Sequence, residues 1–231
     1  MTRRRRFFVP GFPQHVVQRG NDRQVVFRSD DDRLRYLDYV VEAAEKHACA
    51  IHCYVLMGNH VHFLVTPGHE QSLPKTMQSV GLRYAQYYNK KYERTGGFWE
   101  GRYHASLVDT ANYLKSCYRY IELNPVRAGI CRYAADYAWS SHCYHALGKP
   151  DRLVTDHRGY LDLNPADETA RRTRYQTWFR LPVCDDELEM IRSSTQQGLV
   201  LGDTTFQQKM EAQLGQAILP HRRGRKRIRV S

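Results

Sequence analysis

Strand-like and helix-like patterns of hydrophobic residues alternate over the first 125 residues of the chain. Short apolar segments predict four strands, at residues 14–19, 50–57, 60–65 and 103–108. Apolar residues at helical spacing predict three helices, at about residues 30–47, 73–92 and 110–123. Gly58-Asn59 predicts a hairpin turn between the second and third strands. The predicted order is therefore β-α-β-β-α-β-α.

The first six of these elements match the split βαβ, or ferredoxin-like, arrangement. We therefore predict an α+β fold in which an antiparallel sheet carries two helices on one face, with the third helix as an addition. The pattern changes after Trp139, where prolines and acidic stretches separate short helical segments near 166–180, 185–196 and 203–216. No repeat and no chemistry-bearing motif is evident there. The predicted organisation is a ferredoxin-like domain at 1–147, a helical appendix at 148–220 and a basic tail at 221–231.

Charge is concentrated at the two ends of the chain. The 35 Lys and Arg residues exceed the 24 Asp and Glu residues by eleven. Ten of these excess charges lie in the terminal segments, so residues 7–220 carry a net charge of only +1. A nearly neutral body with two basic arms suits a polyanionic partner such as nucleic acid, although charged tails can also be merely solvated.

Neither a membrane segment nor a disulfide framework is evident. No apolar run approaches the about 20 residues that a membrane span requires, and the N-terminal apolar stretch is too short for a secretory signal. The six cysteines form no Cys-x-x-Cys pair, which favours free thiols in a reducing compartment. We expect a cytoplasmic protein that does not contact a membrane.

Two short segments contain candidate chemistry. His60-Val61-His62 lies on a predicted strand, where alternation places both imidazoles on one face. Two imidazoles on one face can bind a divalent metal ion, although such pairs are also found as ordinary hydrogen-bonded histidines. Tyr120 and Asn124 are four residues apart at the end of a predicted helix, so their side chains project together beside a buried stripe. Because 16 of the 231 residues are tyrosine, the count alone favours a packing role for Tyr120.

The two segments together resemble one family. The motifs are GNHVHFLV at 58–65, FWEGRY at 98–103, YIELNPVRAG at 120–129 and WSS at 139–141. Over residues 7–147 the chain resembles the REP-associated tyrosine transposases, within the single-tyrosine HUH (His-hydrophobic-His) transposases of the insertion-sequence-200 type. The resemblance implies a ferredoxin-like endonuclease that cuts and rejoins single-stranded DNA beside REP-like hairpins.

The resemblance also implies roles for individual residues. His60 and His62 match the metal-binding pair, and Tyr120 matches the nucleophile that forms a 5′-phosphotyrosine link. Asn124 stands where related transposases often carry a glutamine that completes the metal site, and its shorter side chain suits a contact through water. Mg²⁺ or Mn²⁺ is the expected ion, because phosphate and water oxygens suit these metals in the remaining positions.

Basic residues supply the candidate DNA contacts. Beside the motifs these are Arg102, Arg119 and Arg127, for which exposed salt bridging is the alternative. In the two arms they are Arg3, Arg4, Arg5, Arg6, Arg222, Arg223, Arg225, Lys226 and Arg227. We expect a monomer, with a homodimer as the alternative. Three other functions compete with strand transfer: hairpin binding without cleavage, a replication-initiator or relaxase nuclease of the wider HUH group, and a zinc hydrolase.

Overall fold

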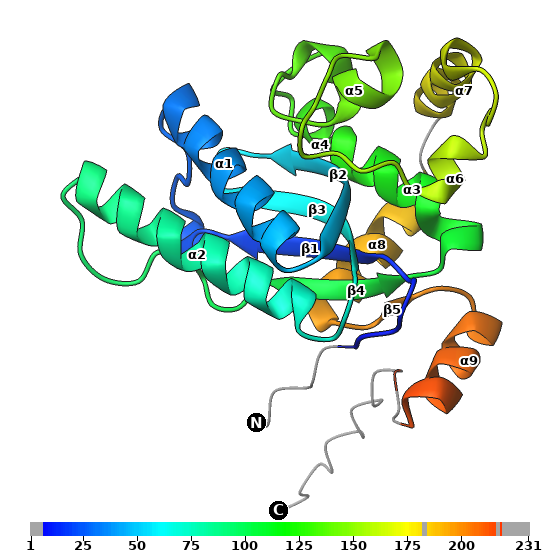
Figure 1. The fold of residues 1–231 in the computed structure, drawn as a ribbon, viewed down its shortest axis with the longest axis horizontal. Coiled ribbons are helices and arrows are strands. Elements are labelled where there is room, and N and C mark those ends of the chain that lie inside the picture. The colour runs from blue at the N-terminus through cyan, green and yellow to red at the C-terminus, as the bar shows by residue number, and fades with distance from the viewer. Residues whose placement is uncertain (1–6, 182–183, 216–217, 219–231) are drawn as a thin grey trace, which may run out of the picture.

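Five strands form one sheet in the computed structural model, which describes residues 7–181, 184–215 and 218 (Figure 1). The sheet order is β2-β3-β1-β4-β5, and every pairing is antiparallel except that of β4 with β5. The first four strands have the order expected of a split βαβ fold. The strand bounds are Gln14–Arg19 for β1, Cys49–Leu56 for β2, His60–Pro67 for β3, His104–Val108 for β4 and Val200–Leu201 for β5.

The predicted elements of the N-terminal half are confirmed. The helices are α1 at Asp30–Lys46, α2 at Ser72–Lys91 and α3 at Thr110–Glu122. Ser29 begins α1 with a capping box, in which its hydroxyl accepts from the Asp32 amide and the Asp32 carboxylate accepts from the Ser29 amide. Asp109 begins α3 by accepting a hydrogen bond from the Ala111 amide. The α+β class is therefore confirmed.

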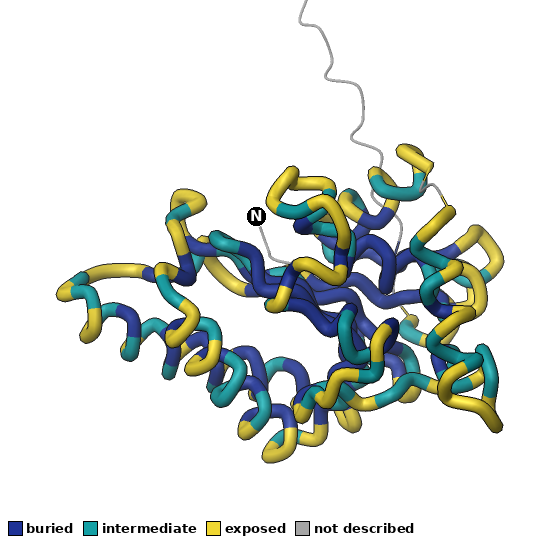
Figure 2. The backbone as a smooth tube through the Cα atoms, turned by 90° about the horizontal axis from the view of Figure 1, so that it is seen from above, coloured by how far each residue is buried: buried dark blue, intermediate teal, exposed yellow. Residues whose placement is uncertain are grey.

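The two predicted helices, α1 and α2, lie together on one face of the sheet, and further helices cover the other face. Val16, Val61 and Phe63 pack on one face against Tyr36 of α1 and Tyr84 of α2. The opposite face is covered by α3 and by α8 (Figure 1). Figure 2 shows the buried strands between helical layers whose outer turns are exposed. The second layer is needed because β2 and β3 are apolar at positions of both faces, and a strand of that kind is buried on both sides.

The C-terminal segment contributes to this second layer. Its helices include α7 and α8, which lie close to the predicted 166–180 and 185–196, and α9, which lies within the predicted 203–216. Gly198 ends α8 with a φ of +65°, a left-handed conformation that favours glycine, and the chain then pairs as β5 beside β4. The bounds are α4 Asn124–Arg127, α5 His142–Leu147, α6 Arg158–Leu161, α7 Glu168–Arg180, α8 Asp185–Gln197 and α9 Thr204–Leu214, with 3₁₀ turns η1 at Asn21–Arg23 and η2 at Ala134–Asp136.

A buried carboxylate connects α3 to the C-terminal helices. Glu122 has no exposed surface, and both of its oxygens accept hydrogen bonds. The four donors come from the segments after Trp139: Ser141 at 2.6 Å, His142 at 3.0 Å, His145 at 3.0 Å and Tyr175 at 2.8 Å. Burial favours a raised pKa for Glu122, but the two histidines outweigh burial and lower it to about 2. His142 and His145 therefore stabilise the buried Glu122 carboxylate, which has a structural role.

Among the described residues, no helix is both long enough and apolar enough to cross a membrane.

Candidate active site

The paired histidines lie on β3, on the face that α3 and α8 cover. The rings of His60 and His62 are 5.0 Å apart between centroids, and Val61 is buried in the core on the other face. The predicted alternation is therefore confirmed. Nδ1 of His60 lies 2.6 Å from the side-chain oxygen of Asn59, and because that oxygen only accepts, Nδ1 holds the proton. Burial, and then Arg19, lower the pKa of His60 to about 4, so its ring is neutral at pH 7.

Tyr120 lies in the last turn of α3, against the histidines. Its ring meets His15 and His62 edge-on, with centroid separations of 5.4 Å and 5.7 Å. The side chain is buried, with 7% of its surface exposed, and it lines the same pocket as His60 and His62. The structure therefore brings the predicted phenol and the predicted imidazole pair together from segments about 60 residues apart.

Asn124 begins α4, directly after α3, and projects into the same pocket as Tyr120. Its Nδ2 lies 3.2 Å from Nε2 of His62. The amide is thus in direct contact with one of the two imidazoles, at the position where a metal-completing side chain was expected. An amide can present either its nitrogen or its oxygen by turning about its last bond.

His15 is a third histidine in the site, and sequence reasoning missed it. It lies on β1 next to β3, where strand alternation places it on the face of His62 and opposite Val16. Its Nε2 is 2.9 Å from Nδ1 of His62, and the two rings are nearly parallel. Burial, and then Arg127, lower the pKa of His15 to about 3. Burial and the neighbouring His15, His60 and arginines also hold the pKa of His62 well below its usual value.

Helix α8 adds two further residues that the sequence did not indicate. Thr195 is buried, and its hydroxyl lies 2.8 Å from Nδ1 of His15. Arg192, one turn earlier, lines the same pocket as Tyr120, and its positive charge interacts with the Tyr120 phenol. Burial lowers the pKa of Arg192, but Tyr120 and Glu189 outweigh burial and raise it. No local motif marks either residue, because α8 reaches the site only through its packing beside β4.

These side chains line one pocket of about 520 Å³. Arg19 and Arg23 lie at the same pocket from β1 and η1, and Arg19 is 3.9 Å from the exposed carboxylate of Glu100. A row of guanidinium groups beside neutral imidazoles gives the pocket a positive lining. Such a lining suits a phosphate group.

Comparison with known proteins identifies the family. Residues 9–124 match the family described as "Transposase IS200 like", which is half of the chain and includes His60, His62 and Tyr120. The chain belongs to the IS200-like transposase family. No curated protein matches the sequence.

One of two similar solved structures supports the fold. A structure described as a REP-associated tyrosine transposase bound to a REP hairpin matches with a TM-score of 0.54 and 16% identity, covering 68% of this chain and 93% of that chain. A candidate transposase from Deinococcus radiodurans matches with a TM-score of 0.37 and 18% identity, covering 58% of this chain and 97% of that chain. The first of these likenesses shows that this family member shares its fold with a transposase.

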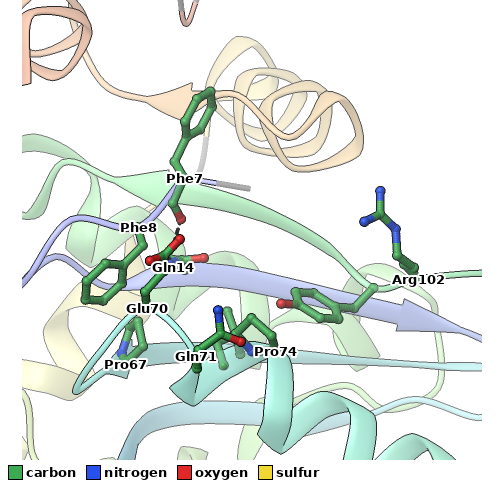
Figure 3. A pocket seen from close by; sticks show the side chains of 10 residues that line it. Phe7, Phe8, Gln14, Pro67, Glu70, Gln71, Pro74 and Arg102 are labelled. Atoms are coloured by element: carbon green, nitrogen blue, oxygen red, sulfur yellow. Dashed lines mark hydrogen bonds between the residues drawn. The ribbon is translucent and has the colours of Figure 1, made fainter. Parts of the chain in front are cut away.

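The predicted DNA-contact arginines of this transposase are placed in three different environments. The Arg127 guanidinium lies 4.6 Å from the centroid of the Tyr120 ring, beside the site. Arg119 is buried and donates to the Leu181 carbonyl, so the structure corrects its prediction: it joins α3 to the segment before α8. Arg102 lines another pocket, on the α2 side of the sheet, where Figure 3 shows it at the edge, away from Phe8.

The remaining candidates lie outside the described residues. They are Arg3, Arg4, Arg5, Arg6, Arg222, Arg223, Arg225, Lys226 and Arg227.

The side chains in this pocket fit a divalent metal ion that is coordinated partly by the protein and partly by a phosphate of the DNA. His60 keeps its proton on Nδ1, which leaves Nε2 unprotonated, and a metal-binding histidine is typically oriented by such a hydrogen bond. Across the described ranges, no three or more His, Cys, Asp and Glu side chains are arranged to hold a metal ion. An ion on His60 and His62 would therefore draw its other ligands from Asn124, water and the DNA.

Proposed function

We propose that this transposase is a metal-dependent single-strand DNA endonuclease and strand transferase that uses Tyr120 as its nucleophile. The observation that carries the proposal is the position of the Tyr120 ring, which meets both His15 and His62 edge-on in the pocket that also contains His60 and Asn124. Family membership supports DNA strand cleavage, and the segment that matches the family contains His60, His62 and Tyr120.

In the proposed reaction, the Tyr120 hydroxyl oxygen attacks phosphorus and the bond from phosphorus to the 3′ oxygen breaks. The 3′ oxygen leaves and takes up a proton, while the phenolic proton passes to solvent. The product is a 5′-phosphotyrosine link and a free 3′-hydroxyl. This link keeps the phosphodiester bond energy, so rejoining by the reverse reaction needs no ATP.

Each group in the pocket has a distinct task in this reaction. His60 and His62 would hold Mg²⁺ or Mn²⁺, with Asn124 beside them; when bound, the ion neutralises charge on the scissile phosphate and polarises the phosphorus atom. Arg192 lines the same pocket as Tyr120, where its positive charge stabilises the negative charge that develops on the phenol oxygen. Arg19 and Arg23 lie where they can hold the phosphates of the strand.

The proposed substrate is single-stranded DNA that carries a REP-like hairpin. Support comes from the shared fold of the solved transposase that is bound to a REP hairpin. The basic segments at both ends of the chain supply charge that suits a DNA stem. We propose that the protein acts as a monomer in the cytoplasm.

Covalent capture tests the proposal. The full-length protein is incubated with a labelled single-stranded hairpin and Mn²⁺, and the products are separated under denaturing conditions. We expect a protein–DNA adduct with wild type, none with Tyr120→Phe, and none when a chelator removes the metal. Hairpin binding without any adduct would instead support the binding-only alternative, and an equal adduct from Tyr120→Phe would eliminate Tyr120 as the nucleophile.

A further inference from the structure

A chain of hydrogen bonds runs from the backbone of α8 to the pocket. The Thr195 hydroxyl donates to the Ile191 carbonyl at 2.9 Å and lies 2.8 Å from Nδ1 of His15. Nε2 of His15 lies 2.9 Å from Nδ1 of His62. Nε2 of His62, at the far end, faces Nδ2 of Asn124.

The groups at the ends of this hydrogen-bond series indicate which atoms carry the protons. A carbonyl oxygen can only accept, so the single hydroxyl proton of Thr195 is directed to Ile191. Toward His15 the hydroxyl must then accept, which places the His15 proton on Nδ1 and leaves its Nε2 as an acceptor. His62 must in turn donate from Nδ1 to His15, because a hydrogen bond between two imidazoles needs one donor and one acceptor.

Two further contacts agree with this direction. Ser106 lies 3.0 Å from the Thr195 hydroxyl, and a serine proton directed at Thr195 reinforces its role as acceptor. At the other end, Nδ2 of Asn124 lies 3.2 Å from Nε2 of His62, and because an amide N–H can only donate, this contact agrees with an unprotonated Nε2. The hydrogen-bonding side chains behind His62 are nearly inaccessible to water: His15 and Ser106 are each 1% exposed, and Thr195 is 2% exposed.

We propose that Thr195 and His15 are positioning residues, which hold His62 in the tautomer that is protonated on Nδ1 and so present its unprotonated Nε2 to the pocket. A metal ligand needs that unprotonated nitrogen, and partners on the other ring nitrogen are the usual way to fix it. The role of this tautomer in metal binding rests on the proposed function, whereas the positions of the protons on His15 and His62 do not.

The proposal gives α8 a role in the site. The residues matched to the family end at 124, while Thr195 lies 180 residues from His15 in the sequence and reaches it only because α8 packs beside β4. The C-terminal segment is therefore part of the site's construction rather than an appended unit. Removal of a single buried hydroxyl group there should be detectable at His62.

Histidine ring nitrogens report the tautomer directly. Long-range proton–nitrogen correlation spectra of the full-length, metal-free protein, labelled on histidine, distinguish a protonated Nδ1 from a protonated Nε2. We expect His62 and His15 to be protonated on Nδ1 alone in the wild-type protein. A wild-type His62 protonated on Nε2 would overturn the proposal.

Substitutions at Thr195 test whether its hydroxyl fixes the tautomers of His15 and His62. Thr195→Val removes the hydroxyl at nearly constant volume, so His62 should populate both tautomers and its affinity for Mn²⁺ should fall about 10- to 100-fold. Thr195→Ser restores the hydroxyl and should restore both properties. The matched control is Thr177→Val on α7, because Thr177 makes the same bond to the carbonyl four residues earlier but lies exposed on another helix.

The outcomes separate this proposal from the proposed function. If Thr195→Val keeps the wild-type tautomer and Mn²⁺ affinity, Thr195 has no positioning role, even if DNA cleavage is demonstrated. If the wild-type protein shows the expected tautomer but neither binds Mn²⁺ nor forms an adduct, the proton order stands and the proposed function fails. If Thr195→Val does not fold, as judged by circular dichroism, the wild-type spectrum still tests the proposal, because a His62 protonated on Nε2 would overturn it.

Discussion

The Tyr120 ring stands edge-on to the His62 ring, with centroids 5.7 Å apart and ring planes at 71°. This contact joins the end of α3 to the middle of the sheet, and it places a phenol beside the candidate metal pair without any movement of the chain. A nucleophile and an electrophilic centre must be held close together for rapid reaction. The arrangement is therefore already assembled within one chain.

Arg192 should accelerate attack by Tyr120. Its guanidinium interacts electrostatically with Tyr120 in the same pocket, so Arg192→Ala removes a positive charge from near the oxygen that becomes negative. Because the Arg192 side chain is 52% exposed, water weakens the effect, and we expect adduct formation to slow about 10-fold, which is about 1.4 kcal/mol of barrier. Single-turnover kinetics with saturating hairpin DNA measure this rate.

A variant of Glu189, which forms an ion pair with Arg192, is the control for Arg192→Ala. Glu189 forms an ion pair with Arg192 at 2.8 Å, and its own side chain is 63% exposed. Glu189→Gln should leave the rate of adduct formation nearly unchanged. Equal slowing in both variants would show that the fold of α8, rather than the charge beside Tyr120, is responsible.

Glu122 should make stability depend on pH. Its folded pKa of about 2 lies below the ordinary value of 4.5, so its contribution is complete above about pH 4.5 and is lost as the pH falls toward 2. Glu122→Gln leaves several buried donors facing an amide instead of an anion, and we expect it to lower the free energy of unfolding by about 3 kcal/mol at pH 7.

Urea unfolding at several pH values tests this expectation. The difference between wild type and Glu122→Gln should shrink between pH 5 and pH 3, since the carboxylate's contribution to wild-type stability falls over this range. A difference of constant size across that range would mean that the charge of Glu122 does not stabilise the fold. Glu189→Gln, at an exposed position, serves as the control.

The C-terminal basic segment should contribute to DNA affinity by binding phosphates. Deletion of residues 222–229 removes six positive charges, so DNA binding should weaken and become less dependent on salt. For single strands, every phosphate that the shortened protein no longer binds should reduce the slope of log affinity against log salt by about 0.7. An unchanged slope would show that this segment binds no phosphate.

The sequence predicted local structure well where hydrophobic spacing was regular. Residues 14–19 form the predicted strand, and α1 and α3 lie over the predicted helices at about 30–47 and 110–123. The strand alternation also placed His60 and His62 on one face, because two-residue periodicity is a property of the backbone itself. These features depend on neighbouring residues, which a sequence displays directly.

Other parts of the site depend on packing over long sequence distances. His15, Arg192 and Thr195 carry no motif, and β5 is too short to show a pattern. The prediction for Arg119 failed for a related reason, since exposed and buried positions on α3 could not be separated without knowledge that the segment at Leu181 covers that side of the helix. Tertiary contacts of this kind appear only in the folded chain.

The residue that carries the DNA can be identified by peptide mapping. The adduct formed with hairpin DNA and Mn²⁺ is digested with a protease and a nuclease, and the modified peptide is sequenced by mass spectrometry. We expect a nucleotide attached through phosphate to the hydroxyl oxygen of Tyr120, and to no other residue. Attachment to a different side chain, or cleaved DNA with no protein attached at any stage, would contradict this expectation.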